Sequence, residues 1–291
     1  VSINYDLIRK RDFRVSTGVI YNRVRNEVVS LGTGATAVVS DDDQGNQFNN
    51  SLQEGSNPEE YRDLFGVPTI NLFALGQPIN AFYGARVLGI IQSEQDAIEA
   101  GINPNSEAGQ IGEFIYADLN GDGLIDPRGT DRDIIGDPNP DFTASFVLDI
   151  TYKNFELAAL VRGAFGADVV NLNYFRDPQN GGVGGRANII LQRSTADNTS
   201  SEFPRLNPQR QYAFSDFWIQ DGSFVRLQNL RIGYNFKVKN VFESAKVYLS
   251  GDNLFTIHNY EGLDPEVDFD GIDNSRIPRL SRYSLGVNLS F

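Results

Sequence analysis

The sequence predicts an all-β fold, and more narrowly a transmembrane antiparallel β-barrel with long extracellular loops. Several segments alternate apolar and polar residues over about ten positions, the length that a tilted strand needs to cross a bilayer. Short turns alternate with long polar connections along the chain, as in barrels whose turns lie on one side of the membrane and whose loops lie on the other. No apolar run approaches the roughly 20 residues of a membrane-spanning helix.

The first two strands are predicted to form a hairpin. The opening segment alternates polar residues with Val1, Ile3, Tyr5 and Leu7. After a polar turn, the residues from Phe13 to Tyr21 alternate in the same way. Two alternating segments joined by a short polar turn are typical of a β-hairpin.

A long polar stretch, residues 22–78, follows this hairpin and is broken by Gly and Pro. It is too long for an ordinary connection, so we expect a packed or functional loop region. Residues 79–91 are apolar and strand-like. A short helix is expected at 93–100, because Ser93 is a good N-cap, Asp96 can return a hydrogen bond to it, and Gly101 can end the helix.

The clearest predicted hairpin spans residues 142–165. Both of its arms alternate large apolar residues with polar or small ones around the turn residues Lys153 and Asn154. A two-residue turn there pairs Tyr152 with Phe155, and every apolar residue of one arm then opposes one of the other. The opposite face carries Asp149, Thr151, Glu156 and Arg162, which require water.

The last seventy residues contain three more alternating segments, joined first by a short turn around Lys239-Asn240. In the first segment Val225 and Leu227 alternate on one phase and Leu230 on the other, which indicates a β-bulge near Gln228 or a first half that stands above the membrane. The segment that ends at Phe291 has aromatic residues at its ends and aliphatic residues between them. This order is typical of a strand whose middle faces lipid and whose ends face the headgroups. Counting all segments gives about nine strands.

Composition excludes several classes of function. With a formal net charge of −13, the chain is not expected to bind nucleic acid, which requires a basic face. There is no Cys, and the single His258 lies outside any nucleophile motif, so we expect no enzyme. The chain contains no Met and begins at Val1, so we expect it to be a piece of a longer protein. Acidic residues gather in loops at Asp41–Asp43, Asp118–Asp141 and Asp264–Asp273, which suits cation binding or a hydrated surface.

One loop has the spacing of a calcium site. Oxygen donors recur at alternate positions, and a glycine that permits a sharp turn follows the third of them. The predicted ligands are Asp118, Asn120, Asp122, the carbonyl of Leu124, Asp126 and Asp131. In an EF-hand loop the twelfth position is Glu, whereas here it is Gly129, and no paired helices flank the loop. The alternative is a loop whose Asx turns satisfy its own backbone.

Several of these stretches together resemble a known family. They are YADLNGDGLIDPRGTDRDIIGDPNPDF, YKNFELAALVRGAFGADVVN, DGSFVRLQNLRIGYNF, VYLSGDNLFTIHNYEGLDPEV and SLGVNLSF, with YNRVRNEVVSLG and INAFYGARVLGI nearer the start. In this order they resemble the C-terminal barrel portion of SusC/RagA-family TonB-dependent transporters of Bacteroidetes. The PRGT insertion before Asp131 departs from the usual, tighter spacing, which affects the last predicted calcium ligand.

The resemblance implies that residues 1–291 are the C-terminal part of a 22-stranded barrel, with an N-terminal plug and the first strands outside this chain. It also implies TonB-dependent import of glycan oligosaccharides or peptides across the bacterial outer membrane. The implied partners are a SusD-like surface lipoprotein lid, the TonB-ExbB-ExbD system, and lipid or lipopolysaccharide. The competing hypothesis is a secreted, calcium-dependent β-sandwich adhesin or lectin.

Overall fold

The computed structural model describes residues 1–31, 37–40, 50–52, 70–172, 192–195, 197–199, 202–205, 212–236, 244–274 and 277–290. Three features singled out from the sequence lie outside the described residues, namely Asp41–Asp43, the Lys239-Asn240 turn and Phe291. No helix of the described part is long and apolar enough to cross a membrane.

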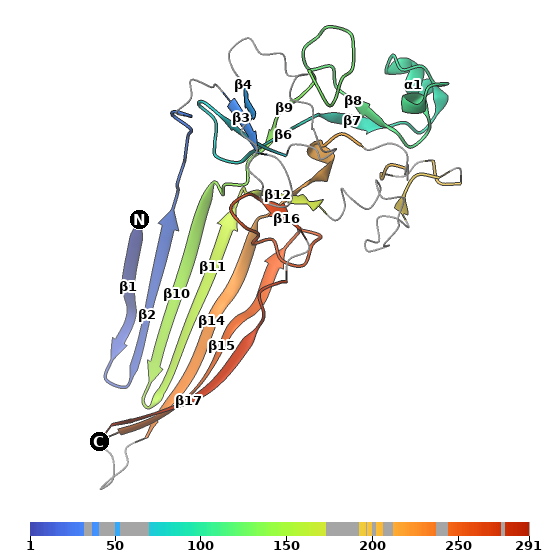
Figure 1. Ribbon diagram of the computed structural model, residues 1–291. Helices are drawn as coiled ribbons and strands as arrows, with labels where there is room; N and C mark the ends of the chain where they lie inside the picture. Colours follow the sequence, from blue (N-terminus) through green and yellow to red (C-terminus); the bar gives the residue numbers. More distant parts are fainter. Residues whose placement is uncertain are drawn as a thin grey trace.

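Seven long strands form one antiparallel sheet, which we call the wall (Figure 1). Its order is β1-β2-β10-β11-β14-β15-β17. The strands are β1 (Ser2–Lys10), β2 (Phe13–Asn22), β10 (Phe142–Tyr152), β11 (Phe155–Phe165), β14 (Phe224–Phe236), β15 (Ser244–His258) and β17 (Arg282–Ser290). The wall thus holds fewer strands than the nine or so counted from the sequence, because residues 70–91 lie in smaller sheets.

The register of β10 and β11 is the one that the apolar pattern predicts. Tyr152 pairs with Phe155, and Ile150 with Leu157, along an unbroken antiparallel ladder. Lys153 adopts a positive φ of 53°, as tight hairpin turns require. The β1–β2 and β10–β11 turns lie at one end of the wall, and the long connections leave from the other end (Figure 1).

Two irregularities set which side chains share a face. In β14, Leu227 and Asn229 pair with adjacent residues of β11, so Gln228 is the bulge that the change of parity predicts. In β1, a register shift between Asp6 and Ile8 places Ile8 opposite Val15. The alternation expected from the sequence therefore holds through Asp6, and the inserted residue Leu7 brings Ile8 onto the same face as Val15.

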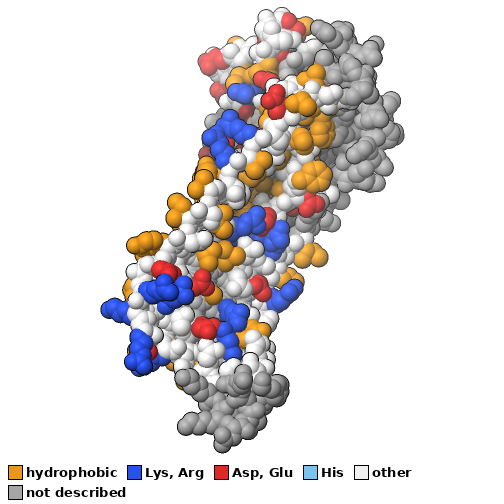
Figure 2. Space-filling model, turned by 90° about the vertical axis from the view of Figure 1, so that its left-hand side faces the viewer, with side chains coloured by type: hydrophobic (Ala, Val, Ile, Leu, Met, Phe, Trp, Pro, Cys, Tyr) orange, Lys and Arg blue, Asp and Glu red, His pale blue; other side chains and the backbone are white. Residues whose placement is uncertain are grey.

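One face of the wall is apolar and uncovered. Its large side chains remain open to the surroundings, with Leu249 exposed by 54% and Leu285 by 75%. Figure 2, with the β1 side toward the viewer, shows hydrophobic side chains along the sheet and basic ones near the end with the short turns. A β-sandwich would bury this apolar face beneath a second sheet, so the uncovered side chains argue against the sandwich alternative. The other face, which we call the inner face, carries most of the charged residues of the strands, among them Arg14, Asp149, Glu156 and Arg162.

The long connections fold into a separate unit, the head, beyond the end of the wall without short turns (Figure 1). One small sheet has the order β4-β3-β5-β6-β9, a second pairs β7 with β8, and a third has the order β13-β12-β16. The strands are β3 (Ala37–Ser40), β4 (Asn50–Leu52), β5 (Asn71–Ala74), β6 (Ala81–Gly84), β7 (Val87–Ile90), β8 (Phe114–Tyr116), β9 (Asp133–Gly136), β12 (Asp168–Asn171), β13 (Ile219–Asp221) and β16 (Ile272–Asp273).

The head has its own hydrophobic core. Phe82, Phe114, Tyr212, Phe214 and Trp218 are buried together, and several of their rings pack edge to face. The α-helix α1 (Glu94–Glu99) has the capping box predicted at Ser93 and Asp96. Two 3-10 turns, η2 (Glu107–Gly109) and η3 (Asp216–Trp218), complete the head. Of the predicted loop region 22–78, Val28 and Ile70 are buried and Ile70 belongs to this core, while residues 32–36, 41–49 and 53–69 lie outside the described residues.

Candidate functional site

The predicted calcium loop connects β8 to β9 in the head, and it closes on its own backbone. The Asp118 carboxylate accepts hydrogen bonds from the N–H groups of Gly121 and Gly123 at 2.7 and 2.9 Å. Asn120 Oδ1 accepts from Asp122 N–H at 2.9 Å, and Asp122 Oδ1 accepts from Leu124 N–H at 2.7 Å. These are successive Asx turns, the alternative that the sequence left open.

Asp131 fastens the two ends of this loop together. Its side chain has 0% exposure, and it accepts hydrogen bonds from the N–H groups of Leu119, Asn120 and Asp126 at 2.8, 3.3 and 2.7 Å. Burial opposes the charge of Asp131, but these three donors outweigh burial and hold the pKa of the carboxyl below its ordinary value. The ionised carboxylate is thus the form that closes the loop.

The residues predicted as ligands do not converge on one point. Asp126 accepts from the N–H groups of Arg128 and Gly129, and Asp131 is occupied by the loop ends. Within the described ranges, no three His, Cys, Asp or Glu side chains are grouped so that they could hold a metal ion. Asp118, Asn120 and Asp122 still offer the hard oxygen donors that Ca²⁺ prefers. Calcium binding at this loop stays a prediction.

A second charged site lies on the inner face, and we call it the arginine network. Arg162 of β11 and Arg226 of β14 are direct cross-strand partners. Arg226, only 3% exposed, contacts Asp264 at 2.6 Å and Glu266 at 2.7 Å. Glu266 also binds Arg162 at 2.9 Å and Arg279 at 3.0 Å. Three arginines therefore share two carboxylates.

Hydrogen bonds fix the geometry of this network. The Nε of Arg226 donates to Thr256 Oγ1 at 2.9 Å, so the guanidinium is oriented by the neighbouring strand. Asp264 accepts from the backbone N–H groups of Glu266 at 3.0 Å and Arg279 at 3.1 Å. Both carboxylates are carried by residues 260–268, a stretch between β15 and β16 that we call the acidic segment. The network thus ties the acidic segment to the wall.

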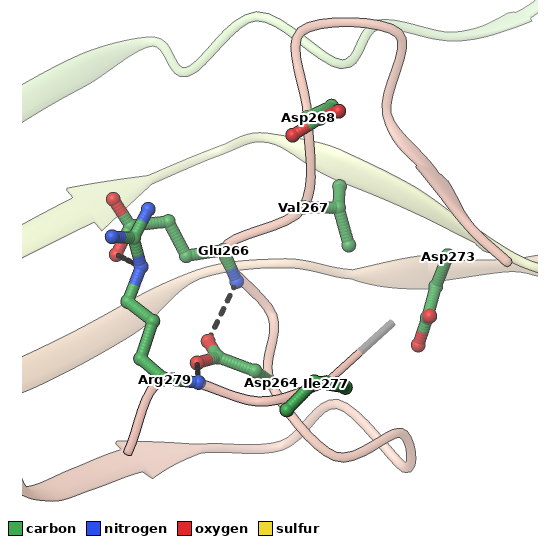
Figure 3. A pocket seen from close by; sticks show the side chains of 7 residues that line it. All are labelled: Asp264, Glu266, Val267, Asp268, Asp273, Ile277 and Arg279. Carbon is green, nitrogen blue, oxygen red and sulfur yellow. Dashed lines mark hydrogen bonds and ion pairs between the residues drawn. The ribbon is translucent and has the colours of Figure 1, made fainter. Parts of the chain in front are cut away.

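A pocket of about 190 Å³ lies beside the network (Figure 3). It is lined by Asp264, Glu266, Val267, Asp268, Asp273, Ile277 and Arg279. Asp273 is buried and accepts a hydrogen bond from the Tyr260 hydroxyl at 2.6 Å, which braces the base of the acidic segment. This hydrogen bond ties the start of the acidic segment to β16, a strand of the head.

Sequence reasoning missed the arginine network. It placed Arg162 on the face that needs water and noted the acidic residues from Asp264 to Asp273 as a hydrated or cation-binding loop. The partners Arg162 and Glu266 are 104 positions apart, and no periodic pattern links them. The usable signal was Arg226, a charged residue between apolar neighbours on a predicted strand, which requires a buried anionic partner.

The architecture defines a class of protein. A wall of long antiparallel strands with an apolar outer face, a charged inner face and short turns at one end is the arrangement of a transmembrane β-barrel. Comparisons with known proteins support this class.

No family model matches the chain. Curated relatives nevertheless cover it completely. TonB-dependent receptor P3 of Formosa agariphila is 30% identical over 305 residues, which is 100% of this chain and 28% of that protein. TonB-dependent receptor SusC of Bacteroides thetaiotaomicron is 27% identical over 300 residues, again 100% of this chain and 26% of that protein. The chain spans about a quarter of the length of the relatives it matches.

Solved structures agree on the fold. The structure of the RagAB peptide transporter matches 100% of this chain and 28% of its own, with a TM-score of 0.69 and 21% identity. The RagAB peptide importer in its open-open state gives a TM-score of 0.71, also at 21% identity. The resemblance to SusC-type TonB-dependent transporters is confirmed by the curated relatives, and so are the barrel fold and the outer-membrane location. The relatives are receptors and transporters, which confirms that no enzyme should be expected.

Proposed function

We propose that this chain forms part of the barrel of a TonB-dependent importer that moves glycan oligosaccharides or peptides across the outer membrane. The observation that carries the proposal is the wall itself. Its apolar face is uncovered along seven strands, while charged side chains occupy the inner face. Hydrocarbon can cover the first face, and an aqueous passage or a polar domain can occupy the other.

The edges of the wall support a larger barrel. Within the described residues β1 pairs only with β2, and β17 pairs only with β15. An unpaired backbone group in hydrocarbon costs several kcal/mol, so each edge requires a further strand. We infer that strands outside this chain complete the barrel, with a plug domain inside it, and that this chain is the C-terminal part of the whole protein.

The head supports a role in capture outside the membrane. It is a packed unit with its own core at the end of the wall opposite the short turns. In outer-membrane barrels the long loops face the outside of the cell. We propose that the head meets the substrate and a SusD-like lipoprotein lid, and that TonB-ExbB-ExbD supplies energy through the part of the protein that precedes this chain. RagAB is a peptide transporter, whereas the names of the other relatives specify no substrate. The proposal therefore includes both peptides and glycan oligosaccharides.

The experiment uses the full-length protein expressed in a strain that lacks its own copy. Uptake of fluorescent peptides and oligosaccharides is measured with functional TonB and with TonB disabled, and a tagged protein is used to isolate bound lipoproteins. We expect uptake of one ligand class only with functional TonB, together with a co-purifying lipoprotein. Retention of the protein in the aqueous phase without detergent would instead favour a secreted adhesin.

Calcium at the loop of residues 118–131 is a second proposal, supported by the alternate spacing of its oxygen donors. Titration calorimetry of the full-length protein with Ca²⁺ is expected to show one binding event that disappears in Asp118→Asn/Asp122→Asn. Asp133→Asn, which changes an exposed carboxylate beside the loop, is the matched control. Equal calcium binding by both variants would exclude this loop as the site.

A further inference from the structure

The two arginines at the centre of the network form an unusual pair. Arg162 and Arg226 face each other directly across β11 and β14. Like charges at directly opposed positions destabilise a sheet, and arginine does not lose its proton in proteins. Arg226 is also almost fully buried, at 3% exposure. The pair is therefore stable only with an anion beside it.

The acidic segment supplies that anion. Glu266 bridges the two arginines, with Oε1 2.9 Å from Arg162 and Oε2 2.7 Å from Arg226, while Asp264 binds Arg226 at 2.6 Å. Planar guanidinium groups bind oxyanions through parallel N–H donors, so the chemistry of the site is general for carboxylate, sulfate and phosphate. The segment's side chains are thus one occupant of a site that suits a class of ligands.

We propose that Arg162 and Arg226 form an oxyanion site on the inner face, filled in this structure by the acidic segment, and that an external oxyanion bound there releases the segment from the wall. The inference rests on the proposed function only in taking the inner face to border the passage. Binding of two ligands to one site is exclusive, so each occupant must weaken the other by the same factor.

Release would change the shape of the passage. The acidic segment forms one side of the pocket beside the network, and the backbone of Arg279 is bound to it through the hydrogen bond to Asp264 (Figure 3). Without those contacts, residues 260–268 remain held near both ends, by the Tyr260–Asp273 hydrogen bond at the start and by the hydrogen bond from Asn80 to the Phe269 carbonyl just after the end. The segment would therefore move as a loop between these two anchors, and the arginine pair would become accessible to a carboxylate-bearing substrate.

The test is hydrogen–deuterium exchange on the purified full-length protein in detergent. Sodium sulfate is compared with sodium chloride at equal ionic strength, and exchange is followed over residues 260–268. We expect sulfate to accelerate exchange there about fivefold or more relative to chloride, without a matching change in the β10–β11 hairpin. Equal exchange in the two salts would overturn the proposal, because general screening would then explain any effect.

Variants separate the site from its surroundings. Asp264→Asn/Glu266→Gln should exchange rapidly in both salts, with no further response to sulfate. Glu261→Gln is the matched control, because Glu261 lies in the same segment but contacts Gln220, and it should behave as the wild type does. A sulfate response that persists in the double variant would overturn the proposal. If the double variant fails to fold, the comparison of sulfate with chloride in the wild-type protein still tests the proposal. The readout needs no transport, so a failure of import leaves it standing.

Discussion

At the level of single residues, the outward or inward direction of a side chain decides its tolerance to charge. Leu148 lies on the apolar face of β10, and Thr151 lies on the opposite face of the same strand. Leu148→Arg should lower the free energy of unfolding by about 2–4 kcal/mol, because a cation at mid-strand would face hydrocarbon. Thr151→Asn should change it by less than about 0.5 kcal/mol. Urea unfolding of the full-length barrel in lipid vesicles measures both, and equal effects would contradict the assignment of faces.

Asp131 makes the closure of its loop depend on pH. Its pKa in the folded protein is lowered, because three backbone N–H donors outweigh burial. A group with a lowered pKa stabilises the fold above its unfolded value, here 3.8, and this stabilisation is lost as the pH falls through the folded value. We expect faster hydrogen exchange over residues 118–131, corrected for intrinsic rates, below pH 3.8. Asp131→Asn should exchange faster at neutral pH and lose the acid response, and an unchanged pH profile in that variant would refute this role.

At the level of the strand, the bulge in β14 keeps two apolar stretches on one face. Gln228 has no partner in β11, where Leu160 and Val161 pair with Asn229 and Leu227. Deleting Gln228 should therefore leave both faces intact and restore regular pairing with β11. On its other side β15 is already irregular, since Asn253 has a φ of 50°.

Deleting Leu160 should have the opposite result. It lies at the same height in the regular strand β11, so its loss turns every residue on one side of the deletion to the other face. Heat-modifiable mobility on SDS gels, which distinguishes folded from unfolded barrels, measures both outcomes. We expect a folded band for the Gln228 deletion and none for the Leu160 deletion. Loss of both bands would show that the bulge itself is required.

For the whole molecule, local patterns predicted the wall and could not predict the site. The β10–β11 register, the bulge at Gln228 and the capping box at Ser93 depend on residues close in sequence, so alternation and turn chemistry were sufficient. The β1 shift at Asp6 left no signal in the alternation. The sequence also predicted too many strands for the wall, because a short apolar run has the same pattern whether it belongs to the wall or to the head.

The arginine network depends on tertiary contacts, whereas the closure at Asp131 depends on contacts within its own loop that residue spacing does not reveal. Arg226 meets Asp264 only because the acidic segment folds back over the inner face, and sequence spacing holds no record of that path. The alternate spacing of oxygen donors identified the aspartate loop in the sequence. The direction of each carboxylate, in contrast, depends on which N–H groups the turn presents. Sequence patterns therefore located the loop and offered its Asx turns as one alternative, but they did not identify the closure by Asp131.

The part of the head that lies between β2 and β10 has a consequence for the order of folding. Thr17 of β2 donates to Val147 of β10 across 130 positions of chain. Closing a flexible loop of that length costs roughly 4 kcal/mol of chain entropy, far more than a two-residue hairpin. A head that collapses early around Phe82 and Phe114 shortens the effective distance between the two strands. Folding of the head in the aqueous phase would then precede, and accelerate, the pairing of β2 with β10 in the bilayer.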